Sequence, residues 1–224
     1  MKKNYRIYNV IILDESGSMG AIKEYTINGF NEVLEAIQQA ETEHSDQQHF
    51  VTFISFNTNG IKTHLFNEPA KKLKPLSREN FLPSACTPLF DAMGSGLTRQ
   101  RDAIAGEKDT EVLVSILTDG QENASVEYNH LAIKKLVDEL KGMGWTITYM
   151  GANHDVESFS ISIGIDHHTQ YMANEADMNR NFKKERASRT AFYSKAGRPE
   201  KGDYFLDDTE EEKKEGKDTD RNFL

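Results

Sequence analysis

The chain has 224 residues, of which 37% are hydrophobic and 28% charged, and its net charge is −9. This composition is typical of a globular protein with one ample core, or at most two small ones. No apolar run approaches the roughly 18 residues that cross a bilayer, so we expect no membrane-spanning segment. The acidic balance argues against a nucleic-acid-binding surface, because such surfaces need clustered Lys and Arg.

The number of cysteines and the N-terminal sequence indicate the cellular compartment of the protein. Cys86 is the only cysteine, so no intrachain disulfide can form, which fits a reducing compartment. The start, MKKNYRIYNV, is basic but has neither the apolar region nor the cleavage site of a secretory signal. We therefore expect a cytoplasmic protein.

Strand-like and helix-like segments alternate along the first half of the chain. Residues 6–13 are rich in aliphatic side chains and predict a buried strand, and residues 22–43 follow with apolar residues at helical spacing. Two further strands at 49–56 and 61–66 are separated by Asn-Thr-Asn-Gly, which predicts a hairpin because Asn-Gly supplies the positive φ of tight turns. The proline-bearing segment 67–87 is predicted as a polar loop.

The second half continues the alternation. A helix is expected from Pro88, which suits a first helical turn, to about Ala105, and a nearly continuous apolar strand follows over 111–118. The pattern then predicts a helix around 133–140, a strand over 145–151, a short helix over 156–163, a short strand near 165–171 and a helix from 175 to about 195.

Strands that alternate with helices predict a doubly wound α/β fold. Its sheet would be mostly parallel and covered on both faces, with one antiparallel edge strand from the hairpin. We expect one domain over residues 1–172, a basic C-terminal helix over 173–201 and an acidic, disordered tail over 202–224. Residues 178–201 carry a charge of +6, and the tail carries −5.

Ligands of such sheets bind outside the carboxyl ends of the strands, where the strand order reverses. The first predicted strand ends in DESGS, in which Asp14, Ser16 and Ser18 alternate with Glu15 and Gly17. Alternate side chains of a tight loop can converge on one spot. One carboxylate and two hydroxyls form a hard oxygen cluster, which suits Mg²⁺, Mn²⁺ or Ca²⁺ and does not suit zinc.

Two loops near neighbouring strand ends carry further candidate oxygen ligands. Thr87 lies just before a helix in SACTPLFDAM, and Asp119 ends an apolar strand in VSILTDGQEN. The sequence of DxSxS, Thr before Pro-Leu, and a strand ending in Thr-Asp-Gly resembles the von Willebrand factor type A (vWA) domain with its metal-ion-dependent adhesion site. The resemblance covers roughly residues 5–172 and implies a Rossmann-like fold. It also implies a metal site made of Asp14, Ser16, Ser18, Thr87 and Asp119.

The resemblance implies a function as well. In this family the held cation accepts a carboxylate from a partner protein. Two aspartates only neutralise a divalent cation, and hydroxyls add no charge, so the site can still attract a third carboxylate. Stand-alone intracellular members serve as adaptors for AAA+ ATPases or in stress and tellurite-resistance systems. We therefore expect a metal-dependent protein-binding module of the bacterial or phage type and no enzymatic activity.

Other interpretations of the same residues remain open. Asp14 and Ser16 would also suit a helix cap, and Asp119-Gly120 would suit a plain turn. An Asp at the end of a first strand is similar to the nucleophile of haloacid-dehalogenase-type phosphatases. Ser16, however, stands where those enzymes carry a second Asp. A Mg²⁺-dependent phosphoryl hydrolase is therefore the alternative function.

Several residues near the predicted site have competing roles. Cys86 has no histidine near it in sequence, so we expect a small buried cysteine and no nucleophile. Glu15 and Glu122 are expected to shape the rim of the site. The side chains of His154-Asp155 and of His167-His168 should diverge, which disfavours a metal site there.

The C-terminal extension offers two more possibilities. Its helix could bind nucleic acid or an acidic surface, although a solvated helix face balanced by the acidic tail is the interpretation that we favour. The acidic run at 210–212 could occupy a metal site, its own or a neighbour's. The basic residues concerned are Arg180, Lys183, Lys184, Arg186 and Arg189.

Overall fold

A computed structural model describes residues 5–152, 155–172, 174–195 and 204–205 of the chain. The strands are β1 (Tyr5–Asp14), β2 (Gln47–Asn57), β3 (Gly60–Pro69), β4 (Thr110–Thr118), β5 (Thr146–Ala152) and β6 (His167–Tyr171). The α-helices are α1 (Lys23–Glu43), α2 (Leu89–Ala103), α3 (His130–Gly142), α4 (Val156–Ser162) and α5 (Glu175–Ser194). Two short 3₁₀ helices are η1 (Gly17–Ile22) and η2 (Ala70–Lys72).

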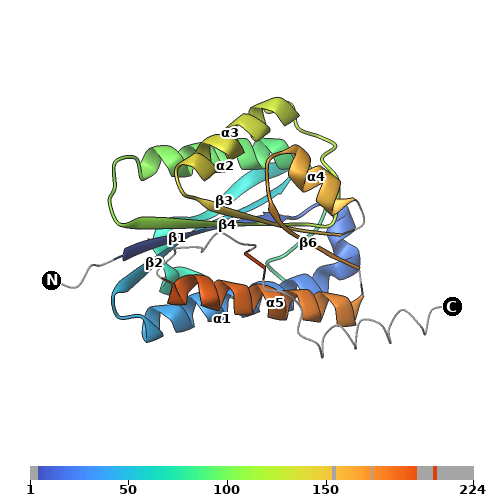
Figure 1. Cartoon of the computed structure of the whole chain (residues 1–224). Coiled ribbons are helices and arrows are strands. Elements are labelled where there is room, and N and C mark those ends of the chain that lie inside the picture. Colours follow the sequence, from blue (N-terminus) through green and yellow to red (C-terminus); the bar gives the residue numbers. More distant parts are fainter. Residues whose placement is uncertain (1–4, 153–154, 173, 196–203, 206–224) are drawn as a thin grey trace.

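The strands form one sheet in the order β3-β2-β1-β4-β5-β6. Neighbouring strands are parallel except for the antiparallel pair β2 and β3. Helices α1 and α5 cover one face of the sheet, and α2, α3 and α4 cover the other (Figure 1). This is the doubly wound, mostly parallel α/β fold with one antiparallel edge strand that the sequence predicts.

Both faces of strand β1 are buried against the rest of the protein. Ile11 and Leu13 belong to the core that includes α1, whereas Val10 and Ile12 belong to the core that includes α2. Because consecutive side chains of a strand point to opposite faces, both sets must be apolar, which explains the continuous apolar run of this strand. Among the described residues, no helix combines the length and the apolar character that a bilayer-crossing helix requires.

The strand order reverses at β1, which pairs with β2 on one side and with β4 on the other. The carboxyl ends of these parallel strands lie at one edge of the sheet. Asp14 is the last residue of β1, and Asp119 directly follows the last residue of β4. The topology therefore brings together two residues that are far apart in sequence, at the point where doubly wound sheets bind ligands.

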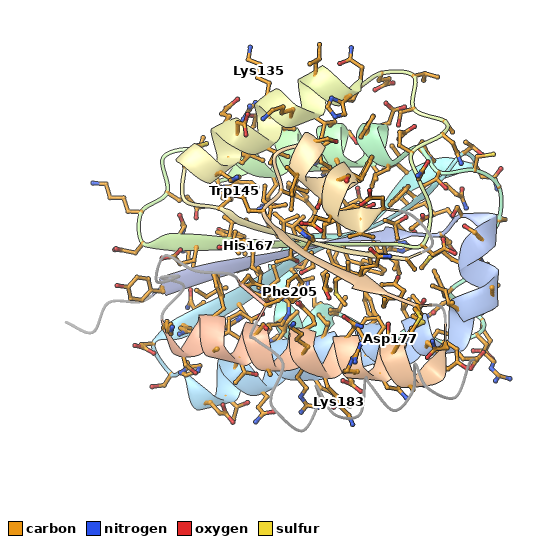
Figure 2. The ribbon with its side chains drawn as sticks, turned by 45° about the vertical axis from the view of Figure 1, so that its right-hand side comes forward. Lys135, Trp145, His167, Asp177, Lys183 and Phe205 are labelled. Carbon is orange, nitrogen blue, oxygen red and sulfur yellow. The ribbon has the colours of Figure 1, made fainter. Side chains whose placement is uncertain are left out.

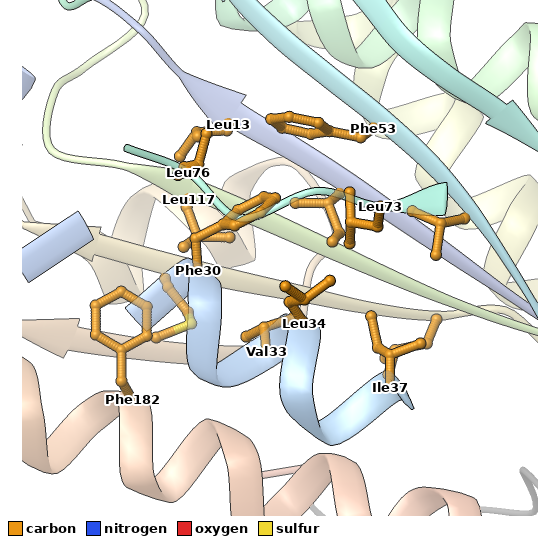
Figure 3. Packing of buried hydrophobic residues seen from close by; sticks show 14 of the residues in the cluster. Leu13, Phe30, Val33, Leu34, Ile37, Phe53, Leu73, Leu76, Leu117 and Phe182 are labelled. Atoms are coloured by element: carbon orange, nitrogen blue, oxygen red, sulfur yellow. The ribbon is translucent and has the colours of Figure 1, made fainter. Parts of the chain in front are cut away.

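The segment 67–87 is more ordered than the predicted polar loop. Strand β3 continues to Pro69, and η2 follows it. Leu73, Leu76 and Phe81 are buried in the same core as helix α1. Figure 3 shows Leu73 and Leu76 in the layer between the sheet and α1. Their side chains close this part of the core, which is why the segment is fixed although most of its residues are polar.

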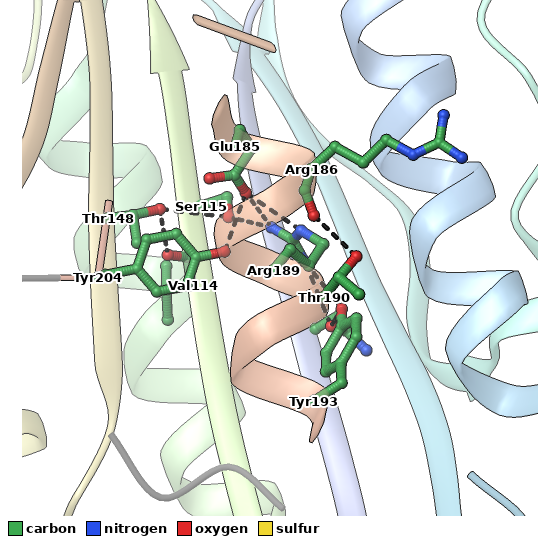
Figure 4. Close-up of polar contacts among 10 residues, drawn as sticks. Val114, Ser115, Thr148, Glu185, Arg186, Arg189, Thr190, Tyr193 and Tyr204 are labelled. Carbon is green, nitrogen blue, oxygen red and sulfur yellow. Dashed lines mark hydrogen bonds and ion pairs between the residues drawn. The ribbon is translucent and has the colours of Figure 1, made fainter. Parts of the chain in front are cut away.

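Helix α5 packs against α1 and the sheet, and its residues Met178, Phe182 and Tyr193 are buried in their shared core. The expectation of a solvated basic helix is wrong for Arg189, which is fully buried. The Arg189 guanidinium donates to Glu185 Oε1 at 2.7 Å and to Ser115 Oγ at 2.5 Å (Figure 4). Arg189 can be buried in this helix because Glu185, one helical turn earlier, compensates its positive charge.

Other basic residues of α5 also have acidic partners in the chain. Arg180 pairs with Asp177, and Arg186 lies 3.6 Å from Glu35. Lys183 is exposed and points away from the sheet (Figure 2). These contacts reduce the positive charge that the helix offers to a nucleic acid.

Most of the predicted acidic tail, including residues 210–212, lies outside the described residues. Tyr204 and Phe205 are described, and both are buried. Figure 2 shows Phe205 between the sheet and α5. Tyr204 donates from its backbone N to His167 Nδ1 at 3.0 Å and from its hydroxyl to Glu185 Oε1 at 3.3 Å. At these two positions the structure differs from the predicted disordered tail, because the two rings are packed in the core.

Gly29 allows α1 and α5 to approach each other closely. A Cβ at this position would lie 2.3 Å from ring atoms of Phe182, whose side chain is only 3% exposed and has little room to shift. We expect Gly29→Ala to lower the free energy of unfolding by about 1–3 kcal/mol, measured by urea denaturation. Gly20→Ala is the control, because a Cβ at Gly20 would meet nothing within 4 Å. Equal losses in both variants would contradict this explanation.

Candidate metal site

The candidate site begins with Asp14 at the end of β1. Its carboxylate is fully buried and accepts hydrogen bonds from Ser16 N to Oδ1 at 2.7 Å and from Thr118 Oγ1 to Oδ2 at 2.6 Å. Among the described residues it has no cationic partner. Burial raises the pKa of Asp14 to about 6, even though these hydrogen bonds act in the opposite direction. Asp14 is therefore a positioned carboxylate whose charge the fold does not neutralise.

Two hydroxyls connect the loop after β1 to the end of β4. Ser18 Oγ donates to Asp119 Oδ1 at 2.7 Å, and Ser16 Oγ lies 3.2 Å from Ser18 Oγ. Ser16 and Asp119 are 1% and 2% exposed, whereas Ser18 is exposed. The oxygen cluster is thus mostly buried, and Ser18 marks its side toward solvent.

Thr87 reaches the same place from the loop before α2. Its backbone N donates to Asn123 Oδ1 at 2.9 Å, and Asn123 N donates to Thr87 O at 3.2 Å. A Cβ at Gly120 would lie 3.6 Å from Ser18 Oγ and 3.7 Å from Thr87 Oγ1. The two hydroxyls therefore face the same small space beside Asp119.

Of the two glutamates near the site, Glu15 does not shape its rim as expected, because it is buried. Glu15 is 4% exposed, and its carboxylate accepts from Ser55 Oγ and from Leu82 N, each at 2.9 Å. Glu122 accepts from Phe90 N at 2.8 Å and from Ser125 Oγ at 2.7 Å. Each carboxylate holds a loop in place, and for the half-buried Glu122 a position at the rim stays a prediction.

Cys86 is exposed, which corrects the prediction of a buried cysteine. Its backbone is fixed to Thr58, because Cys86 N donates to Thr58 Oγ1 and Thr58 N donates to Cys86 O, each at 3.2 Å. Ala85, with a φ of +63°, turns the chain just before it. The turn leaves Thr87 buried and the thiol of Cys86 in solvent.

Three residues that the sequence did not single out position the candidate ligands. Thr118 donates to Asp14, and Asn123 holds Thr87. Tyr171 donates from its hydroxyl to Thr118 O at 3.1 Å, and burial raises the pKa of Tyr171 well above its usual range, so it stays a donor. Of these three residues, only Thr118 could have been found from the sequence, because it is a polar residue that directly precedes Asp119 at the end of an apolar strand.

The donor set fits a hard divalent cation, because every candidate ligand is an oxygen. The described residues contain no group of three or more His, Cys, Asp or Glu side chains that could hold a metal ion. A site at Asp14 and Asp119 therefore depends on hydroxyls as well as carboxylates. For the histidine pairs, His167 Nδ1 accepts from Tyr204 N, and His154 lies outside the described residues.

The order of the strands and the helices on both faces of the sheet define the class of fold: the chain has the fold of vWA domains. The vWF domain of the type V pili tip protein Mfa5 from Porphyromonas gingivalis aligns with a TM-score of 0.55 at 10% identity, over 89% of this chain and 99% of that one. The SpRpn10 VWA domain aligns with a TM-score of 0.52 at 9% identity, over 80% and 94%.

A third structure, proximal thread matrix protein 1 from the mussel byssus, aligns with a TM-score of 0.52 at 20% identity. The alignment covers 88% of this chain and 48% of that one, so this chain spans about half the length of the mussel protein. No protein-family model and no curated protein sequence matches the chain. At these sequence identities the structural similarity establishes only the fold, and the role of the site has to be inferred from the chemistry of its residues.

Proposed function

We propose that this chain is a divalent-metal-dependent protein-binding domain and not an enzyme. The observation that carries the proposal is the convergence of oxygen side chains from three distant segments around two buried aspartates. The residues that would hold Mg²⁺, or alternatively Mn²⁺ or Ca²⁺, are Asp14, Ser16, Ser18, Thr87 and Asp119. When bound, the cation would supply a positive charge to which a carboxylate of a partner protein attaches.

The residues of the chain perform the remaining tasks. Thr118 and the backbone of Ser16 fix the orientation of the Asp14 carboxylate, so little ordering is left for the moment of binding. Asp14 and Asp119 together balance the charge of a divalent cation. Because the remaining donors are neutral hydroxyls, the site does not repel an acidic group. Exposed Ser18 places the opening toward solvent, where an Asp or Glu of a partner can enter.

A partner of this kind also agrees with the resemblance of the motif to vWA domains. The partner class that the resemblance suggests is an intracellular assembly, such as an AAA+ ATPase or a component of a stress system. The hydrolase alternative has less support, because Ser16 stands where haloacid-dehalogenase-type phosphatases carry the second Asp that acts as general acid and base.

A metal-dependent pull-down from the native cell tests the proposal. We expect the wild-type chain to retain a partner in Mg²⁺ and to lose it in EDTA, and we expect Asp119→Ala to lose it in both. Asp102→Ala is the matched control, because Asp102 is an exposed aspartate of α2 outside the candidate site.

Retention of the partner in EDTA would contradict metal dependence. Mg²⁺-dependent turnover of an aryl phosphate that disappears in Asp14→Ala would replace the binding function with a hydrolase.

A further inference from the structure

A cavity of about 260 Å³ lies on the α1 side of the sheet, between β2, β3 and the segment 72–81. Its buried walls are largely apolar. Four of these wall residues are labelled in Figure 3, where they face one another between the sheet and α1. The buried apolar wall residues, none more than 7% exposed, are Leu13, Phe53, Leu73, Leu76 and Phe81, and the half-buried Leu65 also lines the cavity.

Two buried polar residues, Glu15 and Ser55, also line the cavity. Ser55 Oγ donates to Glu15 Oε2 at 2.9 Å, and the other carboxylate oxygen accepts from Leu82 N. His64 Nε2 lies 2.8 Å from Ser55 Oγ. Because the single hydroxyl proton of Ser55 goes to Glu15, Nε2 must be the donor in this contact. The polar groups thus satisfy one another and need no ligand atom.

A β-bulge in β3 shapes one side of the cavity. The register changes from Phe53↔Leu65 to Ile54↔Thr63, so His64 is the extra residue. His64 and Leu65 therefore both line the cavity, and the imidazole stacks on the Phe53 ring with centroids 4.6 Å apart. Bulges re-aim side chains in this way beside binding sites.

The exposed residues of the lining form the mouth, and their charge is positive. Lys72 Nζ lies 2.7 Å from Glu68 Oε2 and is compensated. Lys74 is exposed and has no partner among the described residues. Lys62, which does not line the cavity, lies 3.8 Å from Glu15 Oε2 and offsets part of the buried negative charge. An uncompensated lysine at an apolar opening is notable in a chain whose net charge is −9.

We propose that this cavity binds a small amphipathic carboxylate, such as a medium-chain fatty acid. The apolar body would lie against the leucine and phenylalanine walls, and the carboxylate would lie at Lys74. The cavity is slightly smaller than the roughly 300–1,000 Å³ of typical ligand sites, which restricts the chain length. The buried carboxylate of Glu15 sets the orientation, since it repels a second anion from the interior. This site is separate from the proposed metal site.

Octanoate is the probe, and its binding is measured by calorimetry in EDTA, so that the result does not depend on the metal site. We expect saturable binding at one site. Octylamine has the same chain with the opposite charge and should bind at least about tenfold more weakly. Lys74→Glu should weaken octanoate binding by about tenfold or more and favour octylamine. Lys71→Glu is the matched control: this neighbouring lysine is exposed but does not line the cavity, and we expect no change.

A second variant tests the location. Leu65 is half-buried at the cavity wall, so Leu65→Trp should fill the space and abolish octanoate binding while thermal unfolding remains cooperative. Octanoate binding to Leu65→Trp with wild-type affinity would overturn the proposal, because the ligand would then bind elsewhere. Absence of binding to the wild-type chain, or equal binding of octanoate by Lys74→Glu, would also overturn it.

Discussion

Replacing Arg189 with methionine is expected to lower the free energy of unfolding by about 3–5 kcal/mol, measured by urea denaturation. The arginine and Glu185 are both fully buried, so the single substitution leaves an uncompensated charge in the core. Within the described part of the chain, Glu185 Oε2 already lacks a hydrogen-bond partner, which makes the loss of Arg189 more costly. The guanidinium also connects α5 to the sheet, since it donates to Asn9 Oδ1 at 3.3 Å as well as to Ser115.

A double variant separates charge from shape. Arg189→Met combined with Glu185→Leu removes both charges, and we expect it to recover most of the lost stability. Lys183→Met on the exposed side of the same helix should change stability by less than about 0.5 kcal/mol. If the double variant is as unstable as the single one, then the unpaired charge is not the cause of the loss.

The substitution Asp14→Asn is expected to act in opposite directions with and without metal. In EDTA near neutral pH it should raise the free energy of unfolding by about 2 kcal/mol, because it removes a buried charge. Burial raises the pKa of Asp14 to about 6 from the usual 3.8, so the ionised form is disfavoured in the folded state. The gain should therefore be full above pH 6, shrink as the pH falls and vanish near pH 4, where the carboxyl is neutral in both states.

With Mg²⁺ present, the order of stabilities should reverse. Free Mg²⁺ at 100 times its dissociation constant would stabilise the wild-type chain by about 2.7 kcal/mol, and the asparagine variant should lose this response. Differential scanning calorimetry in EDTA and in Mg²⁺ measures both effects. Asp102→Asn, at an exposed position, serves as the control. An undiminished response to Mg²⁺ in Asp14→Asn would count against the metal site.

The alternation of elements was predictable because each core strand is covered on both faces. The runs that end at Asp14 and Thr118 are apolar for this reason, and their parallel order follows from the helices between them. The hairpin was predictable from Asn-Gly, and Gly60 has the positive φ that the turn requires. The five candidate ligands could be named because Asp14 and Asp119 lie at the ends of predicted strands and because the motifs that contain all five resemble those of vWA domains. That they hold a cation remains a prediction.

Side-chain direction could not be predicted where distant segments meet. The position of Glu15 depends on Ser55 and Leu82, and the position of Arg189 depends on Asn9, 180 residues earlier in the chain. No local pattern carries this information. Cys86 faces solvent because its backbone is held by Thr58, another contact outside the range of any sequence motif.

The β-bulge at His64 in β3 also affects contacts between molecules. An extended, flat edge strand invites another chain to continue the sheet, which leads to aggregation. β3 is an edge strand of ten residues, yet His64 interrupts its register, Lys62 is charged and exposed, and Pro69 ends it without an amide hydrogen. The bulge that places the His64 imidazole against Ser55 and Phe53 thereby protects the border of the sheet from unwanted strand exchange.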